Sequence, residues 1–227
     1  MEFKLAGVDS FIIYFGNEIN KEINTKVKDA FLTLKELDLD EIIELVPSYT
    51  SLYISFNMFK TNHETLINKI KKDLSNSRTS SKSNSKLLQI DVYYGEEVAY
   101  DMQRISKINN ISIKEIISIH SAKIYDVYTI GFLPAFAYLG IVDKKIATPR
   151  LDNPRKKIPK NSLALADAQT AIYSLESPGG WNIIGRTYED IYNKDYENLS
   201  LISFNDKVKF NPISKEKFLD KGGSLES

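Results

Sequence analysis

The chain has 227 residues, enough for one large domain or two small ones, and its 42% hydrophobic and 26% charged residues are ordinary for a globular protein. Its 30 basic and 30 acidic residues cancel, which argues against a nucleic-acid partner. No apolar run reaches the roughly 18–20 residues of a membrane span, and the start, MEFKLAGVDS, does not resemble a signal peptide. With no cysteine, thiolate chemistry is excluded. We therefore expect a cytoplasmic protein without a membrane partner.

Residues 1–76 have the pattern of a small α/β domain. Residues 20–37 carry apolar side chains at helical spacing, and Thr61-Asn-His-Glu64 has the form of a capping box that opens a second helix. Strand-like runs stand at residues 11–16, 41–47 and 51–57. This pattern predicts a four-stranded sheet with two helices on one face. The serine-rich residues 77–86 are interpreted as a linker or loop.

Residues 87–227 are predicted to form a second domain. A strand at 87–94 and a helix at 96–109 come first, and a capping box at Ser112 and Glu115 begins a short helix that ends near residue 120. Beyond it, five of the seven prolines, which lie between Pro134 and Pro178, and a series of short strand-like runs indicate a small antiparallel barrel or sandwich. These runs lie at residues 123–132, 157–166, 170–175, 181–187, 199–204 and 206–210. The fold class is thus α+β with two domains.

The usual catalytic signatures are missing from the sequence. No phosphate-binding loop, dinucleotide fingerprint or serine-nucleophile motif is found. The two histidines, His63 and His120, are far apart in the sequence, so we expect no metal site. For His120, at the end of a short helix, a structural role is favoured over a catalytic one.

Arginines and aromatic residues concentrate in the second domain. Only five of the 30 basic residues are arginine, and Arg150, Arg155 and Arg186 lie in its aromatic, proline-rich part. A guanidinium can hold a carboxylate through two parallel hydrogen bonds, or it can tie loops together through backbone carbonyls. GFLPAFAYLG and ESPGGWNIIGRT place rings and a glycine pair beside these arginines. A ligand cleft and a packed barrel core remain alternatives for the rings, with core favoured for Phe132.

Three motifs in this order carry a resemblance to a known family: GFLPAFAYLG, TPRLDNPRKKIPKNSLALADAQTAIY and SPGGWNIIGRT. The chain resembles the B-type subunit of bacterial ATP-dependent 5-oxoprolinases, a family also catalogued as allophanate hydrolase subunit 1 and as inhibitors of sporulation histidine kinases. The motifs cover residues 128–187, and a weaker likeness extends over nearly the whole chain. The resemblance implies a cyclophilin-like β-barrel as the second domain.

The resemblance also implies a function and partners. Such a subunit acts with subunits A and C in the hydrolysis of 5-oxo-L-proline to glutamate with ATP. The chain itself would bind no cofactor, and the ATP would be used by the complex. Two alternatives remain open: a regulatory protein that binds and inhibits a sensor histidine kinase, and a component of an allophanate- or urea-type carboxyltransferase.

Matching positions give the candidate site. As residues with a catalytic role we expect His120, Arg150, Arg155, Gln169, Arg186 and Thr187. As residues that bind the substrate we expect Phe132, Pro134, Phe136, Tyr138, Tyr173, Gly179, Gly180 and Trp181.

The chain departs from the family pattern at four positions. Glycines are usual where Ala135, Asn161 and Asp167 stand, and a proline where Tyr188 stands. We expect Ala135 to be strained if its position requires a positive φ, and Asn161 to tolerate one better.

Overall fold

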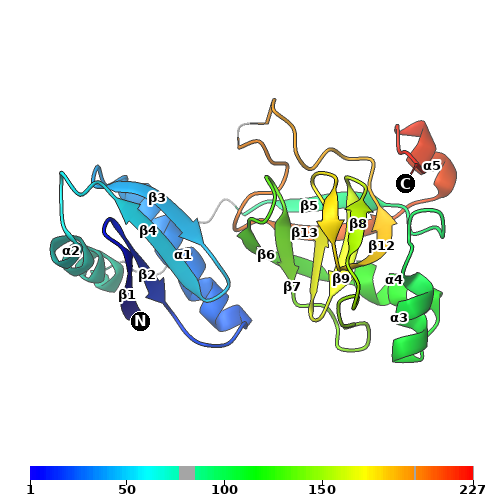
Figure 1. Cartoon of the computed structure of the whole chain (residues 1–227), viewed down its shortest axis with the longest axis horizontal. Helices are drawn as coiled ribbons and strands as arrows, with labels where there is room; N and C mark the ends of the chain where they lie inside the picture. Colours follow the sequence, from blue (N-terminus) through cyan, green and yellow to red (C-terminus); the bar gives the residue numbers. More distant parts are fainter. Residues whose placement is uncertain (77–84, 197, 227) are drawn as a thin grey trace. The chain divides into compact units, whose positions relative to one another are not determined.

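The computed structural model describes residues 1–76, 85–196 and 198–226. The chain divides into two compact units, Met1–Asn84 and Ser85–Ser227 (Figure 1). Most of the predicted linker, residues 77–84, lies outside the described residues.

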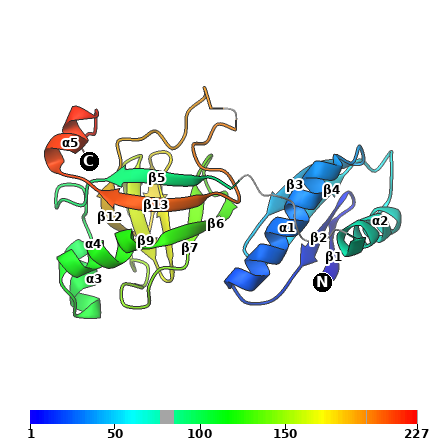
Figure 2. The same ribbon diagram turned by 180° about the vertical axis from the view of Figure 1, so that it is seen from behind.

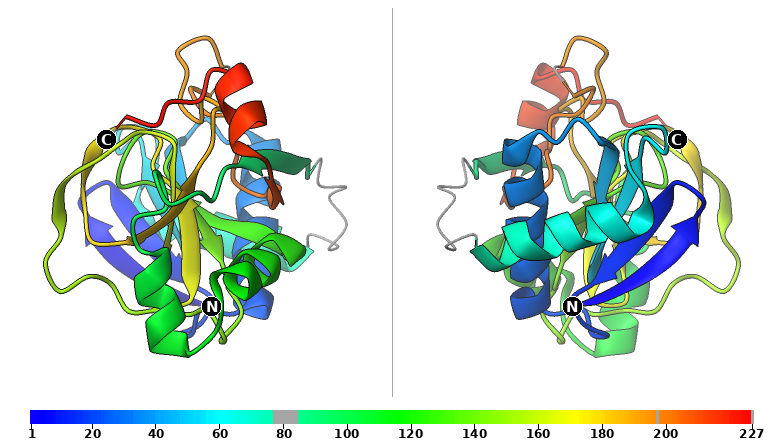
Figure 3. Two further views of the ribbon diagram at one scale, coloured as in Figure 1. Left: turned by 90° about the vertical axis from the view of Figure 1, so that its right-hand side faces the viewer. Right: turned by 90° about the vertical axis from the view of Figure 1, so that its left-hand side faces the viewer.

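The first unit is an antiparallel sheet covered by two helices. Its strand order is β1-β2-β4-β3, with bounds Glu2–Gly7, Ser10–Tyr14, Ser51–Phe56 and Ile42–Pro47 in that order. Helices α1 (Lys21–Leu37) and α2 (His63–Asn76) lie on the same face (Figures 2 and 3). Their apolar faces meet alternate strand residues, such as Phe11, Ile13 and Ile54, in one buried core. The predicted sheet with two helices is confirmed.

Local capping interactions explain where these helices begin. The Asn20 side chain accepts a hydrogen bond from the N–H of Ile23 and starts α1. For α2 the predicted capping residue, Thr61, is wrong by one position. The residue that caps this helix is Asn62, whose Oδ1 accepts the N–H of Thr65 at 3.0 Å.

The second unit is a nearly closed seven-stranded barrel. The strand order is β12-β9-β10-β7-β6-β13-β5, with bounds Asn182–Arg186, Ser162–Ala166, Gln169–Ile172, Ala137–Gly140, Ile124–Ile130, Lys207–Pro212 and Leu87–Val92. Beyond the end of β5, Tyr93 and Arg186 exchange two backbone hydrogen bonds of 2.9 Å, which join the two edges of the sheet. A separate two-stranded ribbon pairs β8 (Arg155–Ile158) with β11 (Ser177–Gly179). The predicted barrel is confirmed.

Three details of the second unit differ from the prediction. Strands β5 and β13 pair in parallel, so the barrel is not wholly antiparallel. Residues 199–204 form no strand, and only Ser200 makes an isolated bridge, with Tyr192. The helix expected from residue 96 begins only at α3 (Met102–Asn109), because the N–H groups of Val98 and Ala99 turn back to the Gly95 carbonyl.

Two further helices complete the second unit. Helix α4 (Ile113–Ala122) begins with the predicted capping box between Ser112 and Glu115, and it packs with α3 against the barrel core. Helix α5 (Lys215–Asp220) is followed by the last described residues. Within the described part of the chain, no helix combines the length and apolar character needed to cross a membrane.

Candidate functional site

An aromatic cavity of about 290 Å³ opens on the second unit, and we call it the aromatic pocket. It gathers seven of the predicted substrate-binding residues and one predicted arginine, which come from strands and loops far apart in the sequence. Its lining consists of Phe132, Phe136, Tyr138, Arg150, Pro154, Tyr173, Pro178, Gly179, Gly180 and Trp181. Pro134 does not line it, and its carbonyl accepts a hydrogen bond from the Ser174 hydroxyl.

The wall of the aromatic pocket is rigid because its rings pack edge to face. Phe136, Tyr173 and Trp181 are buried, and the Phe136 ring lies 5.3 Å from Tyr173 and 5.9 Å from Trp181 between centroids. Phe132 is the exception, since 62% of it is exposed while its edge rests on Phe136. The core role favoured for Phe132 is therefore wrong.

Arg150 supplies the positive charge of the aromatic pocket. Its guanidinium lies over the Trp181 ring at 5.6 Å, a cation–π arrangement. Its Nε lies 3.8 Å from Asp167 Oδ2, and both side chains are more than half exposed. No hydrogen bond from the Arg150 guanidinium to a described residue is found. The terminal nitrogens of Arg150 are thus available to a ligand at the mouth of the pocket.

Two tyrosines contribute hydroxyl groups to the same pocket. Burial raises the pKa of Tyr173 to about 12 and also raises the pKa of Tyr138. Both hydroxyls therefore stay protonated at neutral pH and can donate hydrogen bonds. A Cβ on Gly179 would meet Tyr173 Oη at 2.1 Å, so this position must be glycine for the two segments to approach.

The two glycines of the pair differ in what surrounds them. Neither Gly179 nor Gly180 has a positive φ, and a Cβ on Gly180 would meet only ordinary contacts from 3.6 Å. Close approach therefore explains Gly179 alone.

Three positions at which the resemblance leads us to expect glycine adopt positive φ. The values are 62° at Ala135, 63° at Asn161 and 50° at Asp167. The backbone thus keeps the left-handed conformation, and the strain expected at Ala135 is present.

Arg155 lies outside the aromatic pocket and is paired with an acidic residue. Its Nη1 and Nη2 donate to the two carboxylate oxygens of Asp101 at 2.9 and 2.8 Å. Its guanidinium also lies 5.8 Å from the Tyr100 ring. Asp101 has no counterpart in the sequence prediction, because nothing in the pattern of residues 96–109 singles it out.

His120 is fully buried in the core of the barrel and does not line the aromatic pocket. Its ring nitrogens lie 2.9 Å from Tyr94 Oη and 3.0 Å from Thr170 Oγ1. Burial lowers the pKa of His120 from 6.5 to about 3, so the imidazole is neutral. Gln169 lies on β10, and its Nε2 is buried without a described partner.

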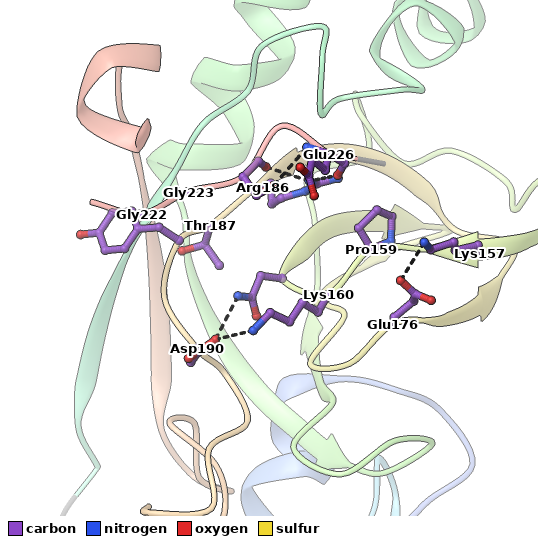
Figure 4. Close-up of a pocket in the computed structure, with 13 residues that line it drawn as sticks. Lys157, Pro159, Lys160, Glu176, Arg186, Thr187, Asp190, Gly222, Gly223 and Glu226 are labelled. Atoms are coloured by element: carbon purple, nitrogen blue, oxygen red, sulfur yellow. Dashed lines mark hydrogen bonds and ion pairs between the residues drawn. The ribbon is translucent and has the colours of Figure 1, made fainter. Parts of the chain in front are cut away.

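Arg186 and Thr187 line a second cavity, of about 390 Å³, which we call the tail cavity (Figure 4). Besides them it is lined by residues of the 157–161 turn and by the C-terminal Gly222, Gly223, Ser224 and Glu226. The aromatic pocket and the tail cavity share no lining residue. The predicted site residues are therefore divided among two cavities, one ion pair and the core.

Comparisons with known proteins agree over most of the chain. Residues 1–202 match the family model "Carboxyltransferase domain, subdomain C and D". The B-type subunit of 5-oxoprolinase from Bacillus subtilis (strain 168) is 32% identical over 96% of this chain and 95% of its own. That of Haemophilus influenzae is 33% identical over 75% of this chain and 79% of its own. The crystal structure of TTHA0988 superposes on 92% of this chain with a TM-score of 0.81 and 27% sequence identity. The TTHA0988 chain is much longer, and the matched part covers 40% of it.

Proposed function

Since the chain belongs to the family of carboxyltransferase domains, subdomain C and D, and both relatives described above are B-type subunits of 5-oxoprolinase, we propose that it is the B-type subunit of a 5-oxoprolinase. The word "subunit" in the names of these relatives supports a complex with other chains, which we take to be subunits A and C. In this proposal the complex uses ATP, and this chain contributes a binding surface for the substrate. The relatives give no support to the alternative of a kinase inhibitor.

One observation carries the proposal: Arg150 lies across Trp181 at the mouth of an apolar cavity of about 290 Å³. The substrate 5-oxo-L-proline is a small lactam ring with one carboxylate. The ring matches the apolar wall of Phe136 and Trp181, while the carboxylate matches the guanidinium, which can bind it through two N–H groups.

The tyrosine hydroxyls give the pocket a second polar point. The hydroxyl of Tyr173 is protonated at neutral pH, and burial raises its pKa to about 12, so it can donate a hydrogen bond to the lactam carbonyl. This chain would thus hold and orient the lactam, and the ATP-dependent chemistry would depend on the other subunits.

Binding can be measured through Trp181, the only tryptophan of the chain. Titration with 5-oxo-L-proline should change its fluorescence in a saturable manner. Arg150→Gln should weaken binding by roughly tenfold or more. Arg150→Lys should weaken it by less, because an ammonium group keeps the positive charge but cannot form the bidentate hydrogen bonds of a guanidinium. Lys144→Gln, which removes an exposed charge outside the pocket, should bind like the unmodified chain.

The activity itself is tested by reconstitution. The chain is co-expressed with candidate subunits A and C, and ATP-dependent release of glutamate from 5-oxo-L-proline is measured with and without it. We expect turnover only with this chain and a loss of turnover with Arg150→Gln. Equal turnover without the chain would refute the proposal.

A further inference from the structure

Arg186 is a buried cation without a counter-ion among the described residues. Only 4% of the residue is exposed, and no carboxylate of a described residue lies within ion-pair distance of its guanidinium. Its Nε–H is buried and has no acceptor in the described part of the chain. Removing a guanidinium from water is costly unless an anion or a full set of acceptors replaces the lost hydration. Arg150 and Arg155 each have a carboxylate partner, so Arg186 differs from both.

The groups that do contact Arg186 are neutral. Its Nη1 donates to the backbone carbonyls of Ser224, at 2.8 Å, and Glu226, while its Nη2 donates to Tyr100 Oη at 3.0 Å. We call residues 222–226 the C-terminal tail, and its carbonyls of Ser224 and Glu226 lie against the guanidinium (Figure 4). Two neutral peptide carbonyls therefore occupy the acceptor positions at Nη1, where a charged carboxylate oxygen would bind more strongly.

The C-terminal tail is held loosely beyond its first two residues. The N–H groups of Gly222 and Gly223 bond to the Leu219 and Phe218 carbonyls, which closes the end of α5. After Gly223, the hydrogen bonds that join the tail to other described residues are the two that Arg186 donates, and Ser224 and Glu226 are exposed. Release of residues 224–226 would thus uncover Arg186 and leave α5 in place.

The space beside Arg186 can receive a ligand. The tail cavity of about 390 Å³ is separate from the aromatic pocket, and its wall carries Lys157 and Lys160 together with the carboxylates of Glu176, Asp190 and Glu226. Each lysine pairs with an exposed carboxylate, Lys157 with Glu176 at 3.2 Å and Lys160 with Asp190 at 3.1 Å. These exposed pairs hold their partners weakly, so the lysines remain able to face an incoming anion.

We propose that Arg186 is a second carboxylate-binding site of this chain and that the C-terminal tail is its displaceable cover. A carboxylate that enters the tail cavity replaces the neutral carbonyls at Nη1 with a charged acceptor and can also reach the unpartnered Nε–H, and this gain offsets the lost tail contacts. The carboxylate is either a small free molecule or an acidic side chain of a partner subunit. The binding site itself does not depend on the proposed function. The choice between a free carboxylate and a side chain of a partner subunit does rest on it.

Displacement of the tail can be followed with a fluorescent label. The chain has no cysteine, so Glu226→Cys provides a unique attachment point on an exposed side chain and keeps the backbone carbonyl. We expect 5-oxo-L-proline or glutamate, at constant ionic strength, to lower the fluorescence anisotropy of the label, whereas chloride leaves it unchanged. If only an added partner subunit lowers it, the carboxylate belongs to that subunit.

Two variants separate this site from the aromatic pocket. Arg186→Gln should give low anisotropy without any ligand and no response to one, while Arg150→Gln should keep the full response even if the aromatic pocket binds nothing. A chain that ends at Gly223 tests the cover without altering Arg186, in case Arg186→Gln does not fold. By calorimetry this shortened chain should bind the carboxylate roughly tenfold more tightly than the full chain.

The proposal is overturned by a specific combination of results. If neither free carboxylates nor partner subunits lower the anisotropy, and the shortened chain binds carboxylates no more tightly than the full chain, the C-terminal tail is a fixed part of the fold. A tail response that survives in Arg186→Gln would equally exclude Arg186 as the site.

Discussion

Asp101 and Arg155 form two parallel hydrogen bonds, of 2.9 and 2.8 Å, between a buried carboxylate and a half-buried guanidinium. Asp101 Oδ2 also accepts the backbone N–H of Ile183 at 2.7 Å. One carboxylate therefore joins the turn before α3, the ribbon strand β8 and the barrel strand β12.

Arg155→Ala should destabilise the chain by about 3 kcal/mol, because it leaves the Asp101 carboxylate buried without its cation. The free energy of unfolding is measured by urea denaturation. The control is Lys157→Ala, which breaks an exposed pair with Glu176 and should cost about 0.5 kcal/mol or less. Equal losses in the two variants would contradict a special role for the buried pair.

Ala135→Gly should stabilise the chain by about 1 kcal/mol, because glycine freely adopts the left-handed conformation in which the Cβ of Ala135 is crowded. The φ of Ala135 is 62°. Thermal unfolding checks this, with Ala137→Gly as the matched control. Ala137 lies two residues further on, in β7, without a positive φ, so its replacement should lower the melting temperature. A lower melting temperature for both variants would argue against strain at Ala135.

Stability should fall on mild acidification because of His120. Its pKa is about 3 in the folded chain and about 6.5 in the unfolded chain, so below pH 6.5 the unfolded state binds a proton that the folded state does not. Between pH 7.5 and pH 5 this difference removes about 2 kcal/mol of stability. Urea titrations across this range measure the slope. In His120→Gln the absolute stability will differ, but the part of the slope that comes from this residue should vanish.

Gly185→Ala should weaken the closure of the barrel. A Cβ at Gly185 would lie 2.8 Å from the Tyr93 carbonyl oxygen and 2.9 Å from Val92 Cγ1, where β12 approaches the end of β5. We expect a loss of about 2 kcal/mol, since a backbone oxygen cannot move aside as a flexible side chain would. Gly131→Ala is the control, because nothing lies within 4 Å of its Cβ position. Chemical denaturation of both variants provides the comparison.

Local signals in the sequence were sufficient for most of the elements. The apolar periodicity of α1 and the capping box of Ser112 and Glu115 are interactions between near neighbours, so the sequence displays them directly. The start of α3 was missed because the turn at Gly95 competes with a periodicity that continues through it. The parallel pairing of β5 and β13 was missed because strand partners far apart in the sequence leave no local trace.

The candidate site was predictable as a set of residues but not as a geometry. The motifs brought Arg150 and the aromatic residues to attention, and these do lie together. The same motifs also contain Arg155 and Arg186, whose surroundings depend on Asp101 and on the C-terminal tail. Both partners lie outside the motifs, so only the tertiary structure reveals that the three arginines occupy three different environments.

The pairing of β5 with β13 has a consequence for synthesis of the chain. Lys207 lies opposite Leu87, and β13 also pairs with β6, so the strand made last fills the gap between two that were made much earlier. During translation, β5 and β6 lack their shared partner until residues 207–212 emerge from the ribosome. Such long-range pairing slows folding and leaves strand edges open to association with other chains. The barrel can therefore close only after nearly the whole second unit has been synthesised.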